Sequence, residues 1–399
     1  MLKDTLKVIV ESQKKELELQ EVGVNREIAQ DLDFKSSHAL IISGIRRCGK
    51  STLLRQLMKK KDCYYLNFED PRLVNFNLSD FEKLDEIFIE LQGKSNKYFF
   101  DEIQNVPEWE RFVRQKQDSG KKFVITGSNA SLLSKELGTK LTGRHLITEL
   151  FPFSYTEMLF LNKTKPSLET FQHYLELGGF PEYLQTKNKE ILRHAFTDIL
   201  NRDIVMRHLL KDQNSIKELA IFLTSNVGKE FSFNSLRKLF NMGSTNTAVA
   251  YVSHLEDSYL LFTVPRFSSS YKKQIANPKK VYSIDTGFAS SNSASFSEDK
   301  GRMLENAVFL GLRRKHKNIF YFREKHECDF LVKERGKIVE AIQVCYKLDE
   351  DNKEREISGL KEAMDSLKIS EGIIITLDQR DTLDKIKVIP VWEWLAESR

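Results

Sequence analysis

The chain of 399 residues is long enough for two to four domains, since a domain usually takes roughly 100 to 200 residues. Hydrophobic residues make up 40% of the sequence and charged residues 30%, with only 8 prolines and 18 glycines, which excludes a disordered or fibrous protein. The formal net charge of +5 permits a nucleic-acid partner but does not require one.

The amino terminus and the cysteines predict a cytoplasmic protein. Residues 1–18 contain only a short apolar run, too short for a signal peptide or a membrane span. The four cysteines are widely spaced and form no CxxC pair, which favours reduced thiols over disulfides or a zinc site. We therefore expect no membrane partner and no metal held by cysteine.

Residues 38–60, HALIISGIRRCGKSTLLRQLMKK, predict a loop that binds nucleotide phosphates. An apolar strand leads into a G-x-x-x-x-G-K-S loop, and an amphipathic helix follows, which argues against a chance match. Gly44 and Gly49 let backbone N–H groups converge on the β-phosphate at a helix N-terminus. Lys50 is expected to reach the β- and γ-phosphates of ATP, and Ser51 to ligate Mg²⁺. The residues assigned to nucleotide binding are Gly44, Arg47, Cys48, Gly49, Lys50, Ser51 and Thr52.

Two later strands end in carboxylates. CYYLNFEDPR (63–72) ends in Glu69 and Asp70, to which we assign no role, and KYFFDEIQNV (97–106) ends in Asp101 and Glu102. In P-loop enzymes the first acid at such a strand end holds Mg²⁺ through water, and the second polarises the attacking water. We therefore expect Asp101 to serve the metal and Glu102 to be the catalytic carboxylate. A structural cap at the strand end is the alternative.

Two further polar positions are candidates for catalysis. KKFVITGSNASLL (121–133) predicts a strand that stops at Ser128 and Asn129, either of which could contact the γ-phosphate and sense hydrolysis; Asn129 could instead cap a helix. Arg144 precedes the apolar strand 145–150, a position that faces the neighbouring subunit in ring-forming ATPases. An arginine there can stabilise transition-state charge in trans. The alternative for Arg144 is an ion pair within its own chain.

The order of the P-loop, FFDEIQ, ITGSN and GRHLITELFPFS resembles the prokaryotic AAA+-type and STAND-related ATPases that end in a restriction-nuclease-like domain. ELGGFPEYL and ILNRDIV extend the resemblance over nearly the whole chain. It implies an α/β fold with an AAA+-type ATPase domain (1–160) and a helical lid (161–212). It also implies that Pro181 lies near the adenine, whereas the turn alone predicts only a helix boundary.

Residues 213–290 predict a winged helix-turn-helix. Three helical segments are split by polar turns, and LFTVPRF with KKVYSIDTGF predicts two strands of a wing. The third helix begins with small hydrogen-bonding side chains suited to phosphate or base edges, and the loop of the wing carries two lysines suited to the DNA backbone. No Arg or Lys follows on this helix, so the alternative is that the helix contacts protein and not DNA. The candidate DNA contacts in this segment are Ser244, Thr245, Asn246, Lys272 and Lys273, and the basic run RRKHK (313–317) of the C-terminal domain adds Arg313 and Arg314.

Residues 291–399 resemble the restriction-endonuclease core in their order of a helix, three strands, a helix and further strands. In that core a Glu on the helix, an Asp on the second strand and an E-x-K on the third gather Mg²⁺; Glu305 and Asp329 match. Gln343 and Cys345 replace the E and the K, and a neutral amide binds Mg²⁺ far less well than a carboxylate. A degenerate nuclease site is therefore expected.

The sequence thus predicts a Mg²⁺-dependent ATPase that binds DNA, including branched or structured DNA, and self-associates as a ring or other homo-oligomer. A STAND-like switch, which assembles with ATP and recruits a protein partner, is the alternative. An active metal-dependent nuclease is the third.

Overall fold

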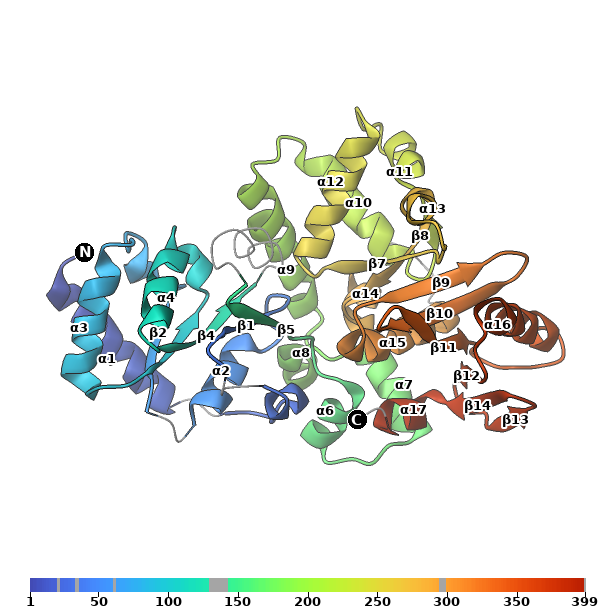
Figure 1. Cartoon of the computed structure of the whole chain (residues 1–399), viewed down its shortest axis with the longest axis horizontal. Coiled ribbons are helices and arrows are strands. Elements are labelled where there is room, and N and C mark those ends of the chain that lie inside the picture. Colours follow the sequence, from blue (N-terminus) through green and yellow to red (C-terminus); the bar gives the residue numbers. More distant parts are fainter. Residues whose placement is uncertain (20–21, 33–35, 60–61, 129–142, 294–298, 398–399) are drawn as a thin grey trace. The chain divides into compact units, whose positions relative to one another are not determined.

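A computed structural model describes residues 1–19, 22–32, 36–59, 62–128, 143–293 and 299–397 (Figure 1). The chain divides into two compact units, Met1–Leu150 and Phe151–Arg399, and each unit is described by itself. No helix within these ranges combines the length and the apolar character needed to cross a bilayer.

The first unit is built on a five-stranded parallel sheet. Its strands lie in the order β2-β3-β4-β1-β5, so the P-loop strand β1 sits between β4 and β5. Strand β1 is buried at every position, as expected for a parallel sheet covered on both faces. This sheet confirms the α/β class that the family resemblance implied. The strands are β1 (Ala39–Ser43), β2 (Tyr64–Asn67), β3 (Lys97–Asp101), β4 (Lys122–Gly127) and β5 (His145–Glu149).

Helices cover this sheet and bury an aromatic core. Helix α1 packs against α3 and against β2, the strand at one edge (Figure 1). The core includes Phe81 stacked on Phe112 at 4.4 Å and Tyr98 stacked on Phe123 at 4.9 Å. The helices are α1 (Lys3–Leu19), α2 (Lys50–Met58), α3 (Asp80–Gln92) and α4 (Trp109–Asp118), with 3₁₀ turns at Glu27–Gln30, Pro71–Leu73 and Ile103–Asn105.

The second unit begins with helices. Ser154 and Ser167 cap two of them with reciprocal capping boxes. Between α7 and α8 the chain makes the turn Gly178–Gly179–Phe180, whose Gly179 N–H donates to the buried carboxylate of Asp285. The helices are α6 (Tyr155–Asn162), α7 (Leu168–Leu177), α8 (Pro181–Thr186) and α9 (Glu190–Asp198), which continues into a π-helix (Ile199–Met206).

Further helices and a small antiparallel sheet follow. The sheet has the order β6-β8-β7. Lys272 and Lys273 were expected in a loop of the wing, and this was wrong: they lie on a short helix, α13. The sequence YKKQIA contains no Gly or Pro and several good helix formers, which explains the difference. The elements are α10 (Gln213–Ser225), β6 (Glu230–Phe231), α11 (Phe233–Leu239), α12 (Thr245–Asp257), β7 (Leu261–Pro265), α13 (Tyr271–Ala276), β8 (Lys279–Ser283) and α14 (Thr286–Asn292).

The last part of the second unit is a mixed six-stranded sheet in the order β13-β14-β12-β11-β10-β9. Strand β10 pairs antiparallel with β9 and with β11, whereas β11, β12 and β14 run parallel to one another. The further strands expected at the end of the chain are present as β12, β13 and β14, and after Pro390 the chain turns into a helix, α17. The elements are α15 (Lys300–Lys315), β9 (Ile319–Arg323), β10 (Glu327–Glu334), β11 (Lys337–Val344), α16 (Lys353–Leu367), β12 (Gly372–Thr376), β13 (Asp381–Leu383), β14 (Ile386–Pro390) and α17 (Val391–Glu397).

Candidate nucleotide site and associated residues

The loop between β1 and α2 depends on two glycines. A Cβ on Gly44 would lie 2.1 Å from the carbonyl oxygen of Leu150, so any side chain at this position would displace backbone. Gly49 has φ +98° at the start of α2, in the left-handed region that favours glycine. These constraints bring the loop back to the N-terminus of α2, where backbone N–H groups are free of helical partners and attract anions.

Lys50, the first residue of α2, is buried against this loop. Its ammonium donates to the carbonyl oxygens of Gly44 (3.1 Å) and Ile45 (3.2 Å) and lies 3.5 Å from the carboxylate of Glu102. Burial alone would lower the pKa of Lys50, but the nearby negative groups, of which Glu102 contributes most, together raise the pKa above its usual value. Lys50 is therefore held as a cation at the mouth of the loop.

Asp101 is the last residue of β3, and one oxygen of its buried carboxylate accepts hydrogen bonds. The hydroxyl of Thr126 on β4 donates to Oδ1, and Ser51 also bonds this side chain. Within the described residues Oδ2 is buried without a hydrogen-bond partner. Burial raises the pKa of Asp101, and the neighbouring Glu102 raises it further. A buried, unsatisfied carboxylate oxygen beside a serine hydroxyl is a donor set that suits Mg²⁺.

Glu102 is fixed in an uncommon backbone conformation next to Asp101. Its φ is +50°, and its N–H donates to Thr126 Oγ1 at 3.0 Å. Gln104 donates its side-chain amide to the Glu102 carboxylate. Burial alone would raise the pKa of Glu102, but Lys50 and Gln104 together hold it below its usual value. Glu102 is thus an ionised carboxylate between the P-loop lysine and the end of β3.

The expected sensor position is only partly described. Ser128 follows β4 and is buried, and within the described residues its hydroxyl has no hydrogen-bond partner. Asn129 lies outside the described residues.

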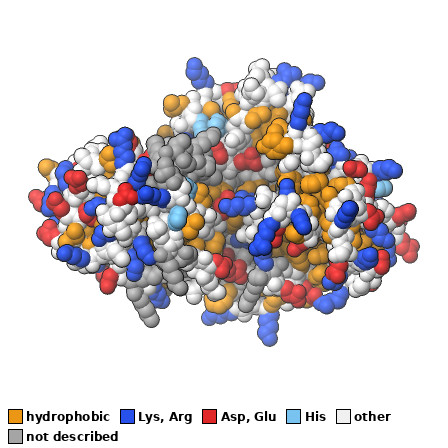
Figure 2. Space-filling model, viewed as in Figure 1, with side chains coloured by type: hydrophobic (Ala, Val, Ile, Leu, Met, Phe, Trp, Pro, Cys, Tyr) orange, Lys and Arg blue, Asp and Glu red, His pale blue; other side chains and the backbone are white. Residues whose placement is uncertain are grey.

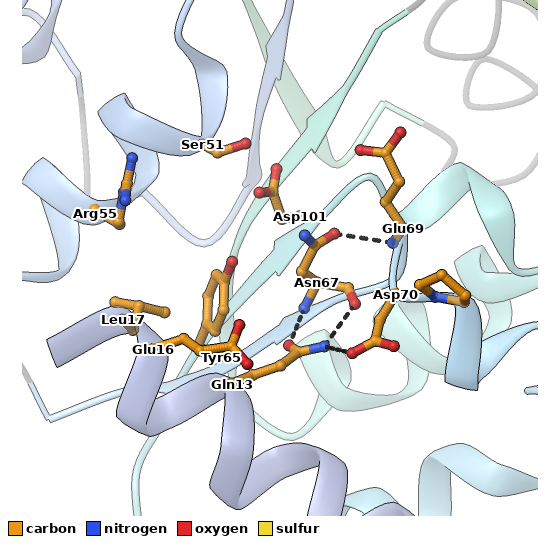
Figure 3. A pocket seen from close by; sticks show the side chains of 11 residues that line it. Gln13, Glu16, Leu17, Ser51, Arg55, Tyr65, Asn67, Glu69, Asp70 and Asp101 are labelled. Atoms are coloured by element: carbon orange, nitrogen blue, oxygen red, sulfur yellow. Dashed lines mark hydrogen bonds between the residues drawn. The ribbon is translucent and has the colours of Figure 1, made fainter. Parts of the chain in front are cut away.

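A cavity of about 400 Å³ opens beside Ser51 and Asp101 (Figure 3). Gln13 of α1 lines the cavity and forms hydrogen bonds with the backbone of Asn67 and the carboxylate of Asp70. Glu69, at the rim, pairs with Arg46 of the P-loop at 3.1 Å. The cavity is lined by Gln13, Glu16, Leu17, Ser51, Arg55, Tyr65, Asn67, Glu69, Asp70, Pro71 and Asp101.

Three residues that shape the nucleotide site, Gln104, Thr126 and Arg26, were not predicted from the sequence. Gln104 donates to the Glu102 carboxylate, and Thr126 bonds both Asp101 and the Glu102 N–H, but nothing in a local pattern marks such bonds. Arg26 is buried and donates to the carbonyl of Cys48 in the P-loop at 2.8 Å, from a segment with no recognisable motif. Glu69 and Asp70 did carry a signal, because they follow β2, an edge strand of the same sheet.

Arg144 immediately precedes β5 and is about half exposed. Its guanidinium pairs with Asp118, the ion pair that was the alternative to a role in trans. Because β5 runs parallel to β1, Arg144 lies at the amino ends of the strands, opposite the edge that carries Lys50 and Asp101. A strand of five residues spans roughly 16 Å, so Arg144 cannot reach the site of its own chain.

The candidate DNA-contacting residues fall into two groups. Ser244, Thr245 and Asn246 are exposed at the start of α12, and Lys272 and Lys273 are exposed on α13. Elsewhere on the face shown in Figure 2, Lys and Arg side chains are scattered among acidic side chains.

Arg313 and Arg314 form the second group, and both are only partly exposed on α15. Arg314 donates to the carbonyl oxygen of Pro152 at 2.8 Å and lies over the ring of Phe151 at 5.1 Å. Arg313 lies over the ring of Phe262 at 5.3 Å. Contacts inside the unit therefore engage both guanidinium groups.

The residues expected in a degenerate nuclease site do come together. Asp329 on β10 accepts from the Val344 N–H of β11, and its own N–H donates to the side chain of Gln343. Glu305 of α15 and Asp329 both contact Lys280 of β8. Cys345 points elsewhere: its thiol donates to the carbonyl oxygen of Lys347 at 2.9 Å.

Pro181 is the first residue of α8 in the second unit. The preceding turn is tightly fixed, since a Cβ on Gly179 would lie 2.0 Å from the carbonyl oxygen of Phe153. Arg202 lies in the π-helix, next to the buried Asp203.

The parallel sheet, the glycine loop and the two acids at the end of β3 define an AAA+ P-loop ATPase module. Residues 36–159 match a family model described as an AAA domain (AAA_14). Two further models, each described as a domain of unknown function (DUF8612 and DUF4143), match residues 168–299 and 300–394.

The uncharacterized protein MJ1544 of Methanocaldococcus jannaschii is 37% identical over 410 aligned positions, covering 93% of this chain and 90% of that protein. The chain belongs to the same family as this archaeal protein. An uncharacterized protein of Haemophilus influenzae is 29% identical, covering 93% of this chain and 97% of that protein. Among solved structures, the Walker-type ATPase of Pyrococcus abyssi has a TM-score of 0.44 at 17% identity, over 67% of this chain and 95% of that chain.

Proposed function

We propose that the first unit binds ATP with Mg²⁺ and hydrolyses it to ADP and phosphate. The observation that carries the proposal is the convergence of Lys50 with Asp101 and Glu102 beyond the carboxyl ends of β1 and β3, two parallel strands separated by β4. Parallel α/β sheets place their ligands at this edge. The AAA domain match over residues 36–159 supports the same conclusion.

The donors present suit a magnesium ion. Ser51 Oγ and the unsatisfied Oδ2 of Asp101 would hold it, directly or through water. When bound, Mg²⁺ would neutralise negative charge that develops on the phosphates.

The chain's own residues supply the remaining chemistry. The backbone N–H groups of residues 47–49 and the ammonium of Lys50 bind the phosphates. Glu102, held ionised by Lys50 and Gln104, accepts a hydrogen bond from the attacking water and orients it. Thr126 fixes both acids at once, because its hydroxyl contacts Asp101 and the Glu102 N–H.

Calorimetry with ATP and Mg²⁺ tests this proposal. The wild-type chain is expected to bind one ATP, and Lys50→Ala to weaken binding at least about tenfold, because a buried charge-assisted contact to phosphate is lost. Lys83→Ala on α3 is the control, since Lys83 pairs with Asp80 on a different part of the unit. An absence of ATP binding by the folded wild-type chain would overturn the proposal.

We further propose that residues 213–290 form a winged helix that contacts DNA through its backbone phosphates. The order of three helices and an antiparallel sheet supports it, as do the exposed start of α12 and the lysines of α13. Several Lys and Arg side chains stand out over this segment at the top of Figure 2. Phosphate-led binding of this kind falls steeply with salt.

Anisotropy titrations with duplex, single-stranded and four-way-junction DNA test the DNA proposal. The double variant Lys272→Ala, Lys273→Ala should bind at least about fivefold more weakly and show a smaller salt dependence. Lys353→Ala with Lys361→Ala on α16 is the matched control, since both lysines are exposed on a helix. Wild-type protein that retains no DNA form at low salt would exclude DNA binding.

A nucleotide-dependent assembly switch is the second candidate function. The position of Arg144 at the far edge of the sheet favours it, because this residue can serve a nucleotide only in another subunit. Light scattering with ATP and with ADP separates the two functions: a switch changes its oligomer size with the nucleotide and turns over slowly, regardless of DNA.

A further inference from the structure

Lys280 of β8 is buried at the centre of three carboxylates. Its side chain is 3% exposed, and its ammonium lies 2.7 Å from Glu327, 2.9 Å from Asp329 and 3.0 Å from Glu305. These acids belong to β10 and α15, which come 25 to 49 residues later in the chain. The lysine therefore reaches from the small three-stranded sheet into the carboxyl-terminal domain.

Burial and the short distances between these groups shift the pKa of Lys280 and of Glu305. Burial alone would lower the pKa of Lys280, but Asp329 and Glu305 raise it well above its usual value. Burial raises the pKa of Glu305 to about 7 despite the lysine beside it. At the rim, Arg323 lies 3.7 Å from Glu327 and 2.9 Å from Glu230 of β6. The ammonium is thus the one cation in direct contact with Glu305 and Asp329 among the described residues.

Other protein groups occupy the remaining approaches to these carboxylates. The hydroxyl of Tyr282 donates to Glu305 Oε1 at 2.6 Å, and a Cβ on Gly228 would lie 3.0 Å from Glu305 Oε2. The Val344 N–H donates to Asp329 Oδ2 at 2.9 Å. Protein donors and close contacts therefore surround the two acids from several elements.

Gln343 fits this closed arrangement better than a carboxylate would. Its side-chain oxygen accepts from the Asp329 N–H at 3.2 Å, and its side-chain amide donates to Glu356 of α16 at 2.5 Å. A glutamate at this position would face Glu356 with a second negative charge and could not donate to it. The neutral amide links β10 to α16 without needing a metal ion.

We propose that the ammonium of Lys280 takes the cation position between Glu305 and Asp329, where these acids would otherwise hold a divalent ion. The carboxyl-terminal domain is therefore closed to metal-dependent cleavage, and the same contact ties β8 to α15 and β10. Carboxylates of this kind are ligands for Mg²⁺ or Mn²⁺ once an internal cation is removed.

Binding of Mn²⁺ without nucleotide tests the proposal. Lys280→Ala is expected to gain one Mn²⁺ that binds at least about tenfold more tightly than any site on the wild type, because the acids lose their internal counter-ion. Adding Asp329→Asn to Lys280→Ala should abolish the gain, and Lys279→Ala should show none. A wild-type chain that binds Mn²⁺ as tightly as Lys280→Ala, and loses it in Asp329→Asn, would overturn the proposal.

A second measurement uses the unmodified lysine and needs no metal. With Lys280 as the resident cation, Asp329→Asn leaves a buried ammonium with less counter-charge, so the melting temperature should fall by about 5 °C or more. If the acids instead formed a self-repelling metal site, neutralising one of them would raise the melting temperature in metal-free buffer. A rise would therefore count against Lys280 as the resident cation.

Discussion

Lys50 Nζ and Glu102 Oε1 lie 3.5 Å apart, which joins the first residue of α2 to the end of β3. Each group shifts the pKa of the other toward the charged form, and both side chains are almost fully buried. The residue that contacts the phosphates and the residue that orients water are thus electrostatically coupled. Changes at either position should be judged by binding and by turnover separately.

Replacement of Glu102 by Gln should separate these two steps. The amide keeps the size of the side chain but cannot act as the ionised acceptor for the attacking water, so hydrolysis should slow at least about a hundredfold. ATP affinity should stay within about threefold of wild type or increase, since the phosphates lose a nearby negative charge. Steady-state turnover and calorimetry measure the two quantities. Glu108→Gln, at an exposed carboxylate, is the control, and normal turnover in Glu102→Gln would refute the assigned role.

Thr126→Val should destabilise the first unit. The valine keeps the volume but removes the donor to Asp101 and the acceptor for the Glu102 N–H, which leaves buried polar groups unpaired. The expected loss is about 1–3 kcal/mol in the free energy of unfolding. Urea unfolding followed by circular dichroism measures it. Thr126→Ser retains the hydroxyl and should lose less than half as much; equal losses would point to packing as the cause.

Gly44→Ala should prevent the normal P-loop from forming. The new methyl group would overlap the carbonyl oxygen of Leu150, which is backbone and cannot rotate away. We expect a loss of more than about 3 kcal/mol in the unfolding free energy and no measurable ATP binding. Gly243→Ala is the matched control, because nothing lies within 4 Å of a Cβ there. Wild-type stability in Gly44→Ala would show that the loop adapts.

Arg144→Ala tests catalysis between subunits. If Arg144 acts in trans, the variant should lose most of its ATP turnover, and mixing it with Lys50→Ala subunits should restore part of it. The restored sites combine an intact P-loop with an intact arginine from the neighbour. Asp118→Ala removes the intrachain partner of Arg144 and should leave turnover high. No recovery in any mixture would assign Arg144 to the ion pair alone.

Asp285 should make the stability of the second unit depend on pH. Burial raises the pKa of Asp285 to about 6 in the folded chain, from roughly 3.9 when unfolded. The folded state therefore binds the proton of Asp285 more tightly than the unfolded state does. The stabilisation that this proton gives the folded state is fully present below about pH 4 and is lost as the pH rises to about 6. The decline amounts to roughly 3 kcal/mol. Unfolding curves at pH 4.5 and 7 for wild type and Asp285→Asn measure it, and parallel changes in both proteins would contradict it.

The first unit was largely predictable because its signals are local. The apolar run 39–42 and the residues after it are enough to predict β1, the loop and α2. The strand that ends at Asp101, just before Glu102, can likewise be predicted from its own residues. The carboxyl ends of parallel strands then bring the acids to the P-loop. The roles of Gln104 and Thr126 depend on which strands become neighbours, which no local pattern specifies.

Lys280 shows why the second unit was harder. In the sequence KKVYS it looks like one of two adjacent surface lysines, and strand alternation does place one of them inside. Its partners follow only from the fold, since Glu305 and Asp329 are distant in the sequence. The same limit applies to Arg314, which the sequence offered as a candidate DNA contact, whereas in the fold it donates to the carbonyl oxygen of Pro152.

The bond from Gly179 to Asp285 spans 106 residues, and Phe180 stacks on Phe288 beside it at 5.1 Å. During synthesis on the ribosome, the five strands of the first unit are complete once residue 149 has emerged. The turn at Gly179 must wait until Asp285 leaves the exit tunnel. Nascent chains that stall between these points would expose Phe180 and α8 to chaperones, so the order of translation separates the assembly of the two units in time.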